Sequence, residues 1–419
     1  MSVNDITQRN LMPINSKLVI FAFFATVLLQ MTAYKFIWGI ESLSRLFNIA
    51  FIVICSGYAL YVLTAIKFNA SVLKFYIIPG LLVYVGFFIN IFINVLSNVK
   101  VINQFGLLIP WAIYLLIPDL LKSNKLDVSS LWRYFNYFML LTISLSLFEY
   151  FALFTGAITP RPIITSGGPF FSGYFSMLYA LESGELHYRF YASFLEPGTL
   201  AMFLLPVIAY AFLHQKYLCL LVYLIAMYMT DSLGGLIGIF LLIPLLVYFK
   251  FRKSMLVAVI LVLMTSFFIG TVYKDDLIDK YENKNNSASV REDSIFNFIN
   301  NLPRLFLEHP FGLPLSVSSE KAAENPIFYG SNFTIGNAFN LGGVLSFLGY
   351  IAVLFVSLWY GVVGLFRKRL SIDEQAVITS IFCLLPFIFQ RSVIWDSSLF
   401  SLLFAPFLIQ FLKRTPGKL

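Results

Sequence analysis

The stretch "HYRFYASFLEPGTLAMFLLPVIAYAF", residues 187–212, changes character at Pro197. Before that proline the chain carries His187, Arg189 and Glu196, and after it the residues are almost continuously apolar. Proline favours the first position of a helix, and a long apolar run is typical of a helix that crosses a lipid bilayer. The stretch therefore predicts a polar loop at the mouth of a membrane-spanning helix.

The composition of the whole chain also indicates a membrane protein. Of its 419 residues, 59% are hydrophobic and only 12% are charged, and the mean hydropathy is +0.82. A soluble domain normally carries roughly twice that charged fraction. The apolar residues cluster in stretches of roughly 17–25, which is the length of a bilayer-spanning helix. We predict an all-α polytopic integral membrane protein.

The apolar stretches predict about twelve transmembrane helices. They lie near residues 18–36, 46–66, 75–96, 103–121, 134–154, 198–213, 217–231, 233–249, 254–273, 341–366, 375–391 and 396–412. With the N-terminus inside, seventeen Lys and Arg fall in cytoplasmic segments and four in the short outside segments. The positive-inside rule then predicts a multi-pass protein with both termini in the cytoplasm. The net charge of +8 reflects this topology, so nucleic acid is not an expected partner.

The spans and two long connections divide the chain into five parts. The first part is an N-terminal bundle of about five spans, and the third and fifth hold about four and about three more. Both long connections fall outside and carry amphipathic runs such as "FFSGYFSMLY" and "FNFINNLPRLF", which predict short helices on the membrane face. Long loops between tightly connected spans are often functional, so we expect the site there. The parts are 1–154, the first outside loop 155–197, 198–273, the second outside loop 274–340, and 341–419 with its cytoplasmic tail.

Arginines in the two outside loops are candidates for binding phosphate. Arg161 and Arg189 lie in the first loop, and Arg291 and Arg304 lie in the second. A guanidinium is a permanently charged, planar fork of donors, so several of them just outside a bilayer would suit a lipid-linked pyrophosphate. The alternative is that they meet lipid headgroups or pair with acids of the loops, namely Glu182, Glu185, Glu308 and Glu324.

Glu196 has a structural and a chemical interpretation. An acid next to a proline makes a good helix start, because the N-terminal dipole favours negative charge. As a general base, Glu196 would instead accept the proton of an attacking sugar hydroxyl. His187 could serve as a base or a phosphate ligand. His309 is a further candidate for substrate binding, but it precedes a proline and also fits the end of a short helix. Tyr191 and its aromatic neighbours would stack on sugars or border a lipid tail.

No metal site or cofactor is predicted. No His/Cys cluster has zinc spacing, and the chain has neither a GxxxxGK[ST] loop nor a GxSxG elbow. At membrane depth Glu149, Asp231 and Arg391 stand out, because buried charge is costly there. All three fall near predicted span ends, so we interpret them as side chains that snorkel to the interface.

Three segments carry a resemblance to the O-antigen ligase and polymerase superfamily of bacterial envelope glycan assembly. "RFYASFLEPGTLAMFLL" (189–205) resembles the family's arginine and "GxFxxPN" pattern at a span entry. "REDSIFNFINNLPRLFLEHPFGLPL" (291–315) resembles its arginine, amphipathic helix and "hPlfGvG". "SNFTIGNAFNLGGVLSFLGYI" (331–351) is similar to "HNxyLxxlxxxGxxGxxxFl". The family's "HN" is Ser331-Asn332 here and its "SRG" is "TDSLGG", and both departures favour the polymerase branch.

The resemblance implies a fold, an activity and residue roles. The fold would be GT-C-like, and the activity a metal-independent glycosyl transfer from a lipid-pyrophosphate donor. Arg189 and Arg291 match the motif arginines and would clamp the donor pyrophosphate. Asn332 matches the motif asparagine and would position the acceptor. Glu196 falls at a variable position of the motif, so its role as a base comes from its own chemistry alone.

The resemblance also implies partners and a location. Donor and acceptor would be undecaprenyl-pyrophosphate-linked oligosaccharides, polymerised into O-antigen or a similar surface polysaccharide on the periplasmic face of the bacterial inner membrane. Membrane lipids and a chain-length regulator would be further partners. Two alternatives stay open, an O-antigen ligase that transfers the polymer to lipid A core, and a flippase or transporter of lipid-linked oligosaccharide. A transporter should carry polar and charged residues along the middle of several spans, and such residues are scarce here.

Overall fold

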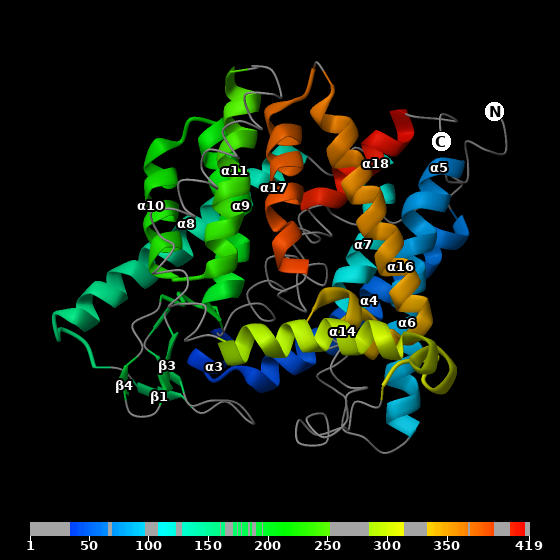
Figure 1. Ribbon diagram of the computed structural model, residues 1–419, viewed down its shortest axis with the longest axis horizontal. Helices are drawn as coiled ribbons and strands as arrows, with labels where there is room; N and C mark the ends of the chain where they lie inside the picture. Colours follow the sequence, from blue (N-terminus) through cyan, green and yellow to red (C-terminus); the bar gives the residue numbers. More distant parts are fainter. Residues whose placement is uncertain are drawn as a thin grey trace.

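The structure is a computed structural model, and its described part is mainly α-helical (Figure 1). The described residues are 34–65, 69–96, 108–122, 128–159, 161–163, 171–173, 175–176, 178–182, 185–186, 190–194, 196–251, 285–313, 333–367, 369–388 and 403–414. The elements of the N-terminal half are α3 (Tyr34–Ile37), α4 (Glu41–Ala65), α5 (Ala70–Val72), the π-helical turn η2 (Leu73–Ile77), α6 (Ile78–Leu96), α7 (Leu108–Lys122) and α8 (Val128–Phe154). The later helices are α9 (Pro197–Leu213), α10 (Tyr217–Met229), α11 (Leu233–Phe251), α14 (Asn285–Glu308), α16 (Thr334–Leu365), α17 (Ile372–Ile388) and α18 (Ala405–Arg414).

Among the described residues, four helices are long and apolar enough to cross a membrane. They support the predicted class of a helical membrane protein. They cover Ala70–Leu96, Val128–Leu153, Leu233–Lys250 and Thr334–Leu365. The predicted spans that begin at 46, 75, 103, 134, 198, 217, 233, 341, 375 and 396 each overlap a helix. The span at 18–36 lies largely, and that at 254–273 wholly, outside the described residues. The number of twelve and the orientation stay predictions.

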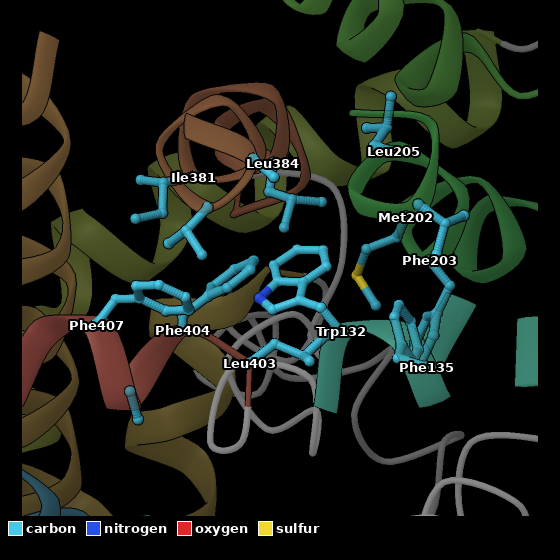
Figure 2. Packing of buried hydrophobic residues seen from close by; sticks show 14 of the residues in the cluster. Trp132, Phe135, Met202, Phe203, Leu205, Ile381, Leu384, Leu403, Phe404 and Phe407 are labelled. Atoms are coloured by element: carbon cyan, nitrogen blue, oxygen red, sulfur yellow. The ribbon is translucent and has the colours of Figure 1, made fainter. Parts of the chain in front are cut away.

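Helix α8 shows how one sequence serves both the core and a lipid-facing surface. Side chains on one side of it are buried, and those on the other side are exposed at helical spacing. The buried set is Trp132, Phe135, Met139 and Ile143, and the exposed set is Tyr137, Leu141, Leu145 and Phe148. Figure 2 shows Trp132 between side chains of α17 and α9, next to the segment that leads into α18. A helix that is apolar on both sides fits a bundle surrounded by lipid.

The first outside loop contains strands where the sequence predicted short helices. The strands are β1 (Arg161–Ile163), β2 (Phe171–Gly173), β3 (Leu178–Glu182) and β4 (Glu185–Leu186), paired antiparallel in the order β1-β2-β3-β4. The strands lie between α8 and α9, outside the predicted spans, so the membrane-embedded part keeps the predicted helical class. Glycines at 167, 168 and 173 disfavour a helix here, because glycine loses more conformational entropy than other residues when it enters a helix. Short runs of aromatic and aliphatic residues between glycines suit strand pairing instead.

In the described part of the second outside loop, α14 is a helix of 24 residues, longer than the short helices that the sequence predicted. In Figure 1, α14 (yellow) runs across the other helices, at the end where α3 and the four strands also lie. We call this the outer end, after the predicted orientation. Phe298 and Leu305 of α14 are buried against Phe339 and Phe347 of α16, so the helix is packed on the bundle.

Helix α16 starts at Thr334, seven residues before the predicted span, and is broken at Gly342 and Gly343. Gly343 has φ 64° and ψ −155°, a region that only glycine adopts readily. The backbone after α14 fills the break, because Leu313 N donates to Asn340 O (2.9 Å) and Val344 N donates to Pro310 O (3.0 Å). The break thus joins the second outside loop to the bundle.

Gly343→Ala should destabilise the fold. A Cβ at this position would lie 2.1 Å from Pro310 O and 2.6 Å from Gly312 N, and the backbone conformation alone costs a non-glycine residue about 1–3 kcal/mol. We expect a clear drop in the melting temperature of the detergent-solubilised protein. Gly57→Ala is the matched control, since a Cβ at Gly57 of α4 meets nothing within 4 Å. Equal melting temperatures for the two variants would contradict this account of the break.

Candidate functional site at the outer end

The chain enters α9 through a buried segment, residues 190–194. Phe190 N donates to Met229 O (2.9 Å), which ties the segment to the end of α10. The Phe190 ring meets Tyr150 of α8 edge-on at 5.7 Å, and Phe194 packs on Phe203 at 5.0 Å. The start of α9 is therefore fixed by apolar contacts on two sides.

Tyr191 belongs to this segment and is itself buried, with 7% of its surface exposed. Its carbonyl accepts a hydrogen bond from Phe194 N (3.0 Å), and Ala192 next to it has a positive φ of 46°. The tight turn follows from these two features. The predicted role of Tyr191 in stacking on a sugar would need its ring to become accessible.

Glu196 occupies the position just before the first turn of α9, and Pro197 begins the helix as the sequence predicts. Its backbone is extended (φ −143°, ψ 141°), and its carbonyl accepts from Thr199 N and Leu200 N, both at 3.1 Å. The side chain is exposed and makes no capping hydrogen bond to the helix. Glu196 therefore starts the helix through its backbone, and its carboxylate lies at the surface of the outer end.

Glu149 is the buried carboxylate of this region. It lies near the outer end of α8 with 6% of its surface exposed, and both its oxygens accept from Ser176 N at 2.9 Å. One turn earlier, Ser146 Oγ donates to Ser176 O (2.9 Å). The expectation that Glu149 snorkels to the interface is wrong, because its carboxylate is turned inward to satisfy the backbone of the first outside loop.

Helix α3 closes the same cluster from another side. Trp38 Nε1 donates to Phe175 O (3.1 Å), and the Trp38 ring stacks on Tyr34 at 4.5 Å. The Tyr34 hydroxyl faces Thr142 and Ser193, close to Glu149. Residues 175–176, which lie between β2 and β3, are thus held by hydrogen bonds from α3 and α8. We call Tyr34, Thr142, Ser146, Glu149, Ser176 and Ser193 the outer polar cluster.

The second outside segment presents Arg304 and His309. Arg304 Nε donates to Glu308 Oε1 at 2.8 Å, and the two side chains are 60% and 47% exposed. This is the pairing with Glu308 that the sequence left open, and an exposed pair of this kind contributes about 0.3–0.5 kcal/mol. His309 follows the last residue of α14, and its N–H donates to Leu305 O (2.9 Å), so it lies at a helix end as predicted.

Asn90 of α6 connects the second segment to the bundle. Its Nδ2 donates to Phe311 O (2.8 Å) and Leu313 O (3.2 Å), while its Oδ1 accepts from Asn94 Nδ2 (2.9 Å). The amide satisfies two carbonyls of the non-helical segment after α14, which lipid could not hydrogen-bond. The segment 310–313 is therefore as firmly held as residues 175–176.

The remaining predicted site residues are placed only by their backbone or lie beyond the described ranges. Arg161 is the first residue of β1, in register with Gly173 of β2. Arg291 lies on α14, seven residues and almost two turns before Phe298, so its position falls on the same face of the helix. His187, Arg189 and Asn332 lie outside the described residues.

Sequence reasoning missed the outer polar cluster as a unit. Glu149 was visible as a charge at membrane depth, and its spacing of three residues from Ser146 places both on one side of a helix. The partner, Ser176, gave no such signal, since it bonds through its backbone. Within the described ranges no group of three or more His, Cys, Asp or Glu is placed to hold a metal ion.

Comparison with known proteins adds no family. No protein-family model matches the chain, and a search of curated proteins finds no similar sequence.

Glu149→Ala should loosen the first outside loop. Its removal leaves the buried Ser176 N–H without an acceptor, which costs about 1–3 kcal/mol. We expect severalfold faster deuterium uptake at residues 175–176 and 190–194 in hydrogen-exchange mass spectrometry of the purified protein. Glu308→Ala, which removes an exposed carboxylate at the same end, should leave that uptake unchanged. Uptake equal to the wild type in Glu149→Ala would show that the carboxylate does not hold the loop.

Proposed function

We propose that the protein is a membrane glycosyltransferase that polymerises undecaprenyl-pyrophosphate-linked oligosaccharide repeat units on the outer face of the bacterial inner membrane. The product would be O-antigen or a related surface polysaccharide. The observation that carries the proposal is the exposed carboxylate of Glu196, seven residues after the motif arginine Arg189, on a rigidly packed start of an apolar helix. Transfer from a lipid-linked donor needs such a group at the level of the headgroups.

The arrangement of the two outside segments supports the same chemistry. The strands, α3, the start of α9 and α14 with Arg291 all lie at one end of the helices (Figure 1). Each segment is anchored to a spanning helix, through Glu149 on α8 and Asn90 on α6. Groups held on rigid supports can stabilise a transition state without reorganising, which is the main need of a transfer reaction with a good leaving group.

In the proposed reaction, a hydroxyl of the acceptor's terminal sugar attacks the anomeric carbon of the donor sugar. The new carbon–oxygen bond forms as the bond to the pyrophosphate oxygen breaks, and undecaprenyl pyrophosphate leaves with the electron pair. Arg189 and Arg291 would neutralise the charge that develops on the pyrophosphate. Glu196 would take the hydroxyl proton.

The distribution of buried charge favours an enzyme over a flippase or transporter. Among the described residues the buried acids are Glu149, Asp373 and Glu374. Glu149 is near the outer end of α8, and the other two are in the first turn of α17. A transport path would need polar or charged groups through the middle of the spans.

Replacing the motif arginines should stop chain growth. In a bacterial strain that lacks its own polymerase, the wild-type protein should restore a ladder of glycan lengths on a gel, while Arg189→Ala and Arg291→Ala should give single repeats at normal expression. Arg133→Ala is the control, since this arginine lies near the start of α8, at the opposite end, bonded to Ser130. The ligase alternative replaces this proposal under two conditions. The wild-type protein makes no ladder, and a strain without the protein accumulates finished lipid-linked chains that are not attached to lipid A core.

Glu196→Gln separates the two interpretations of this residue. Glutamine keeps the length and polarity of the side chain and leaves the backbone contacts of the helix start in place, but it cannot accept a proton. A base contributes typically about 10²–10⁴-fold to rate, so the ladder should shorten strongly while the melting temperature stays the same. A full-length ladder from Glu196→Gln would reduce Glu196 to a residue of the helix start.

A further inference from the structure

Helix α14 has two apolar sides, and only one of them is used for packing. The first side, which includes Phe298 and Leu305, is buried on α16. The second side consists of residues spaced by three or four, and their side chains are largely exposed, with Leu307 83% exposed. We call this second side the α14 stripe; its members are Phe296, Ile299, Pro303 and Leu307, continued by Phe311 just after the helix.

Polar residues form a third side of α14, next to the stripe. They are Asp293, Asn300, Arg304 and Glu308, and all four are exposed. The helix therefore passes, around its axis, from a packed side to an exposed apolar side and then to an exposed polar side. This order is typical of a helix that lies in a membrane interface, with its apolar side toward the acyl chains and its polar side toward water.

The depth of α14 along the bundle agrees with such a position. Its C-terminal end is held to Asn90 of α6 through Phe311 O, and α6 continues six residues further, to Leu96. Six residues of helix rise about 9 Å. Since the hydrocarbon core is about 30 Å thick, a level about 9 Å inside the end of an apolar spanning helix is within the outer leaflet.

Helix α6 exposes apolar side chains near the same level. They are Phe88, Phe92 and Leu96, on the side of α6 turned away from Asn90, which binds Phe311 O. Helix α14 runs across the spans in Figure 1, which is the direction expected of a helix in the membrane interface.

We propose that α14 is an interfacial helix whose stripe is inserted in the acyl-chain region of the outer leaflet. The occupant of the stripe is bulk membrane lipid. This lipid contact does not depend on the proposed chemistry.

The test uses an environment-sensitive fluorophore on the full-length protein in phosphatidylethanolamine/phosphatidylglycerol vesicles. Cys55 and Cys219 are replaced by serine and the buried Cys383 by alanine, and nitrobenzoxadiazole is then attached to Leu307→Cys or Glu308→Cys. These two positions are neighbours in sequence, but they are about 100° apart around the helix. Glu308→Cys is therefore the matched control on the polar side.

Two quenchers read out the environment of the fluorophore. We expect the fluorophore at 307 to be quenched severalfold more by lipids spin-labelled in the acyl chain than the one at 308, and iodide in the buffer to show the reverse preference. Equal quenching of both positions by iodide would overturn the proposal. Shielding of position 307 from both quenchers would also overturn the proposal. If that shielding is then lost when the protein is diluted in lipid, the stripe is covered by a second copy of the chain.

Discussion

The break in α16 at Gly342 and Gly343 is the constraint on which the outer half of the structure depends. A helix interrupted at membrane depth exposes backbone groups that lipid cannot satisfy. Here the segment 310–313 supplies the partners, through its bonds to Asn340 O and Val344 N, and Asn90 of α6 binds the carbonyls that this segment would otherwise leave unsatisfied. The end of α14, the break and α6 are thus one hydrogen-bonded unit. No side chain could replace the hydrogen at Gly343, since a Cβ there would overlap Pro310 O.

The first outside loop is anchored by hydrogen bonds in which the carboxylate of a spanning helix accepts, the reverse of the role of Asn90. Asn90 donates to loop carbonyls, whereas Glu149 accepts from a loop N–H and Ser146 donates to the carbonyl of the same residue. In both cases a polar side chain near the outer end of a span satisfies the backbone of a loop that is distant in sequence. A buried carboxylate is stable only if it is hydrogen-bonded, so Glu149 and the loop stabilise each other. Each outside loop is consequently tied to a spanning helix by a polar side chain.

Features that depend on a local residue pattern, such as helix positions, could be predicted from the sequence. Features that depend on contacts with distant segments could not. Apolar length located α4, the helices from α6 to α11 and those from α16 to α18, and Pro197 located the start of α9. The strands of the first loop were missed because pairing of such short segments is decided by their neighbours and by glycines rather than by periodicity. The inward direction of Glu149 could not be predicted, since it depends on the backbone of Ser176, which any residue would provide. The break in α16 was visible as Gly342-Gly343, but the segment that fills it comes from before the span.

Glu149 and Glu196 are held in a fixed relation although they lie on different helices. At the end opposite the outer end, Asp373 of α17 accepts from Ser129 Oγ (2.6 Å) and lies 2.9 Å from His214 Nε2, so α8, α9 and α17 are joined there. Further along, Trp132 stacks on Tyr210, and Phe135 packs near Phe203 (Figure 2). At the outer end Tyr150 meets Phe190. Helices α8 and α9 are therefore tied at both ends and between them.

Since an α-helix bends little over a few turns, neither carboxylate can move along the membrane normal without breaking these contacts. A base placed on such a pair of helices would stay at a fixed depth relative to the membrane. A lipid-anchored donor is also held at a fixed depth, so the two would stay at matching depths.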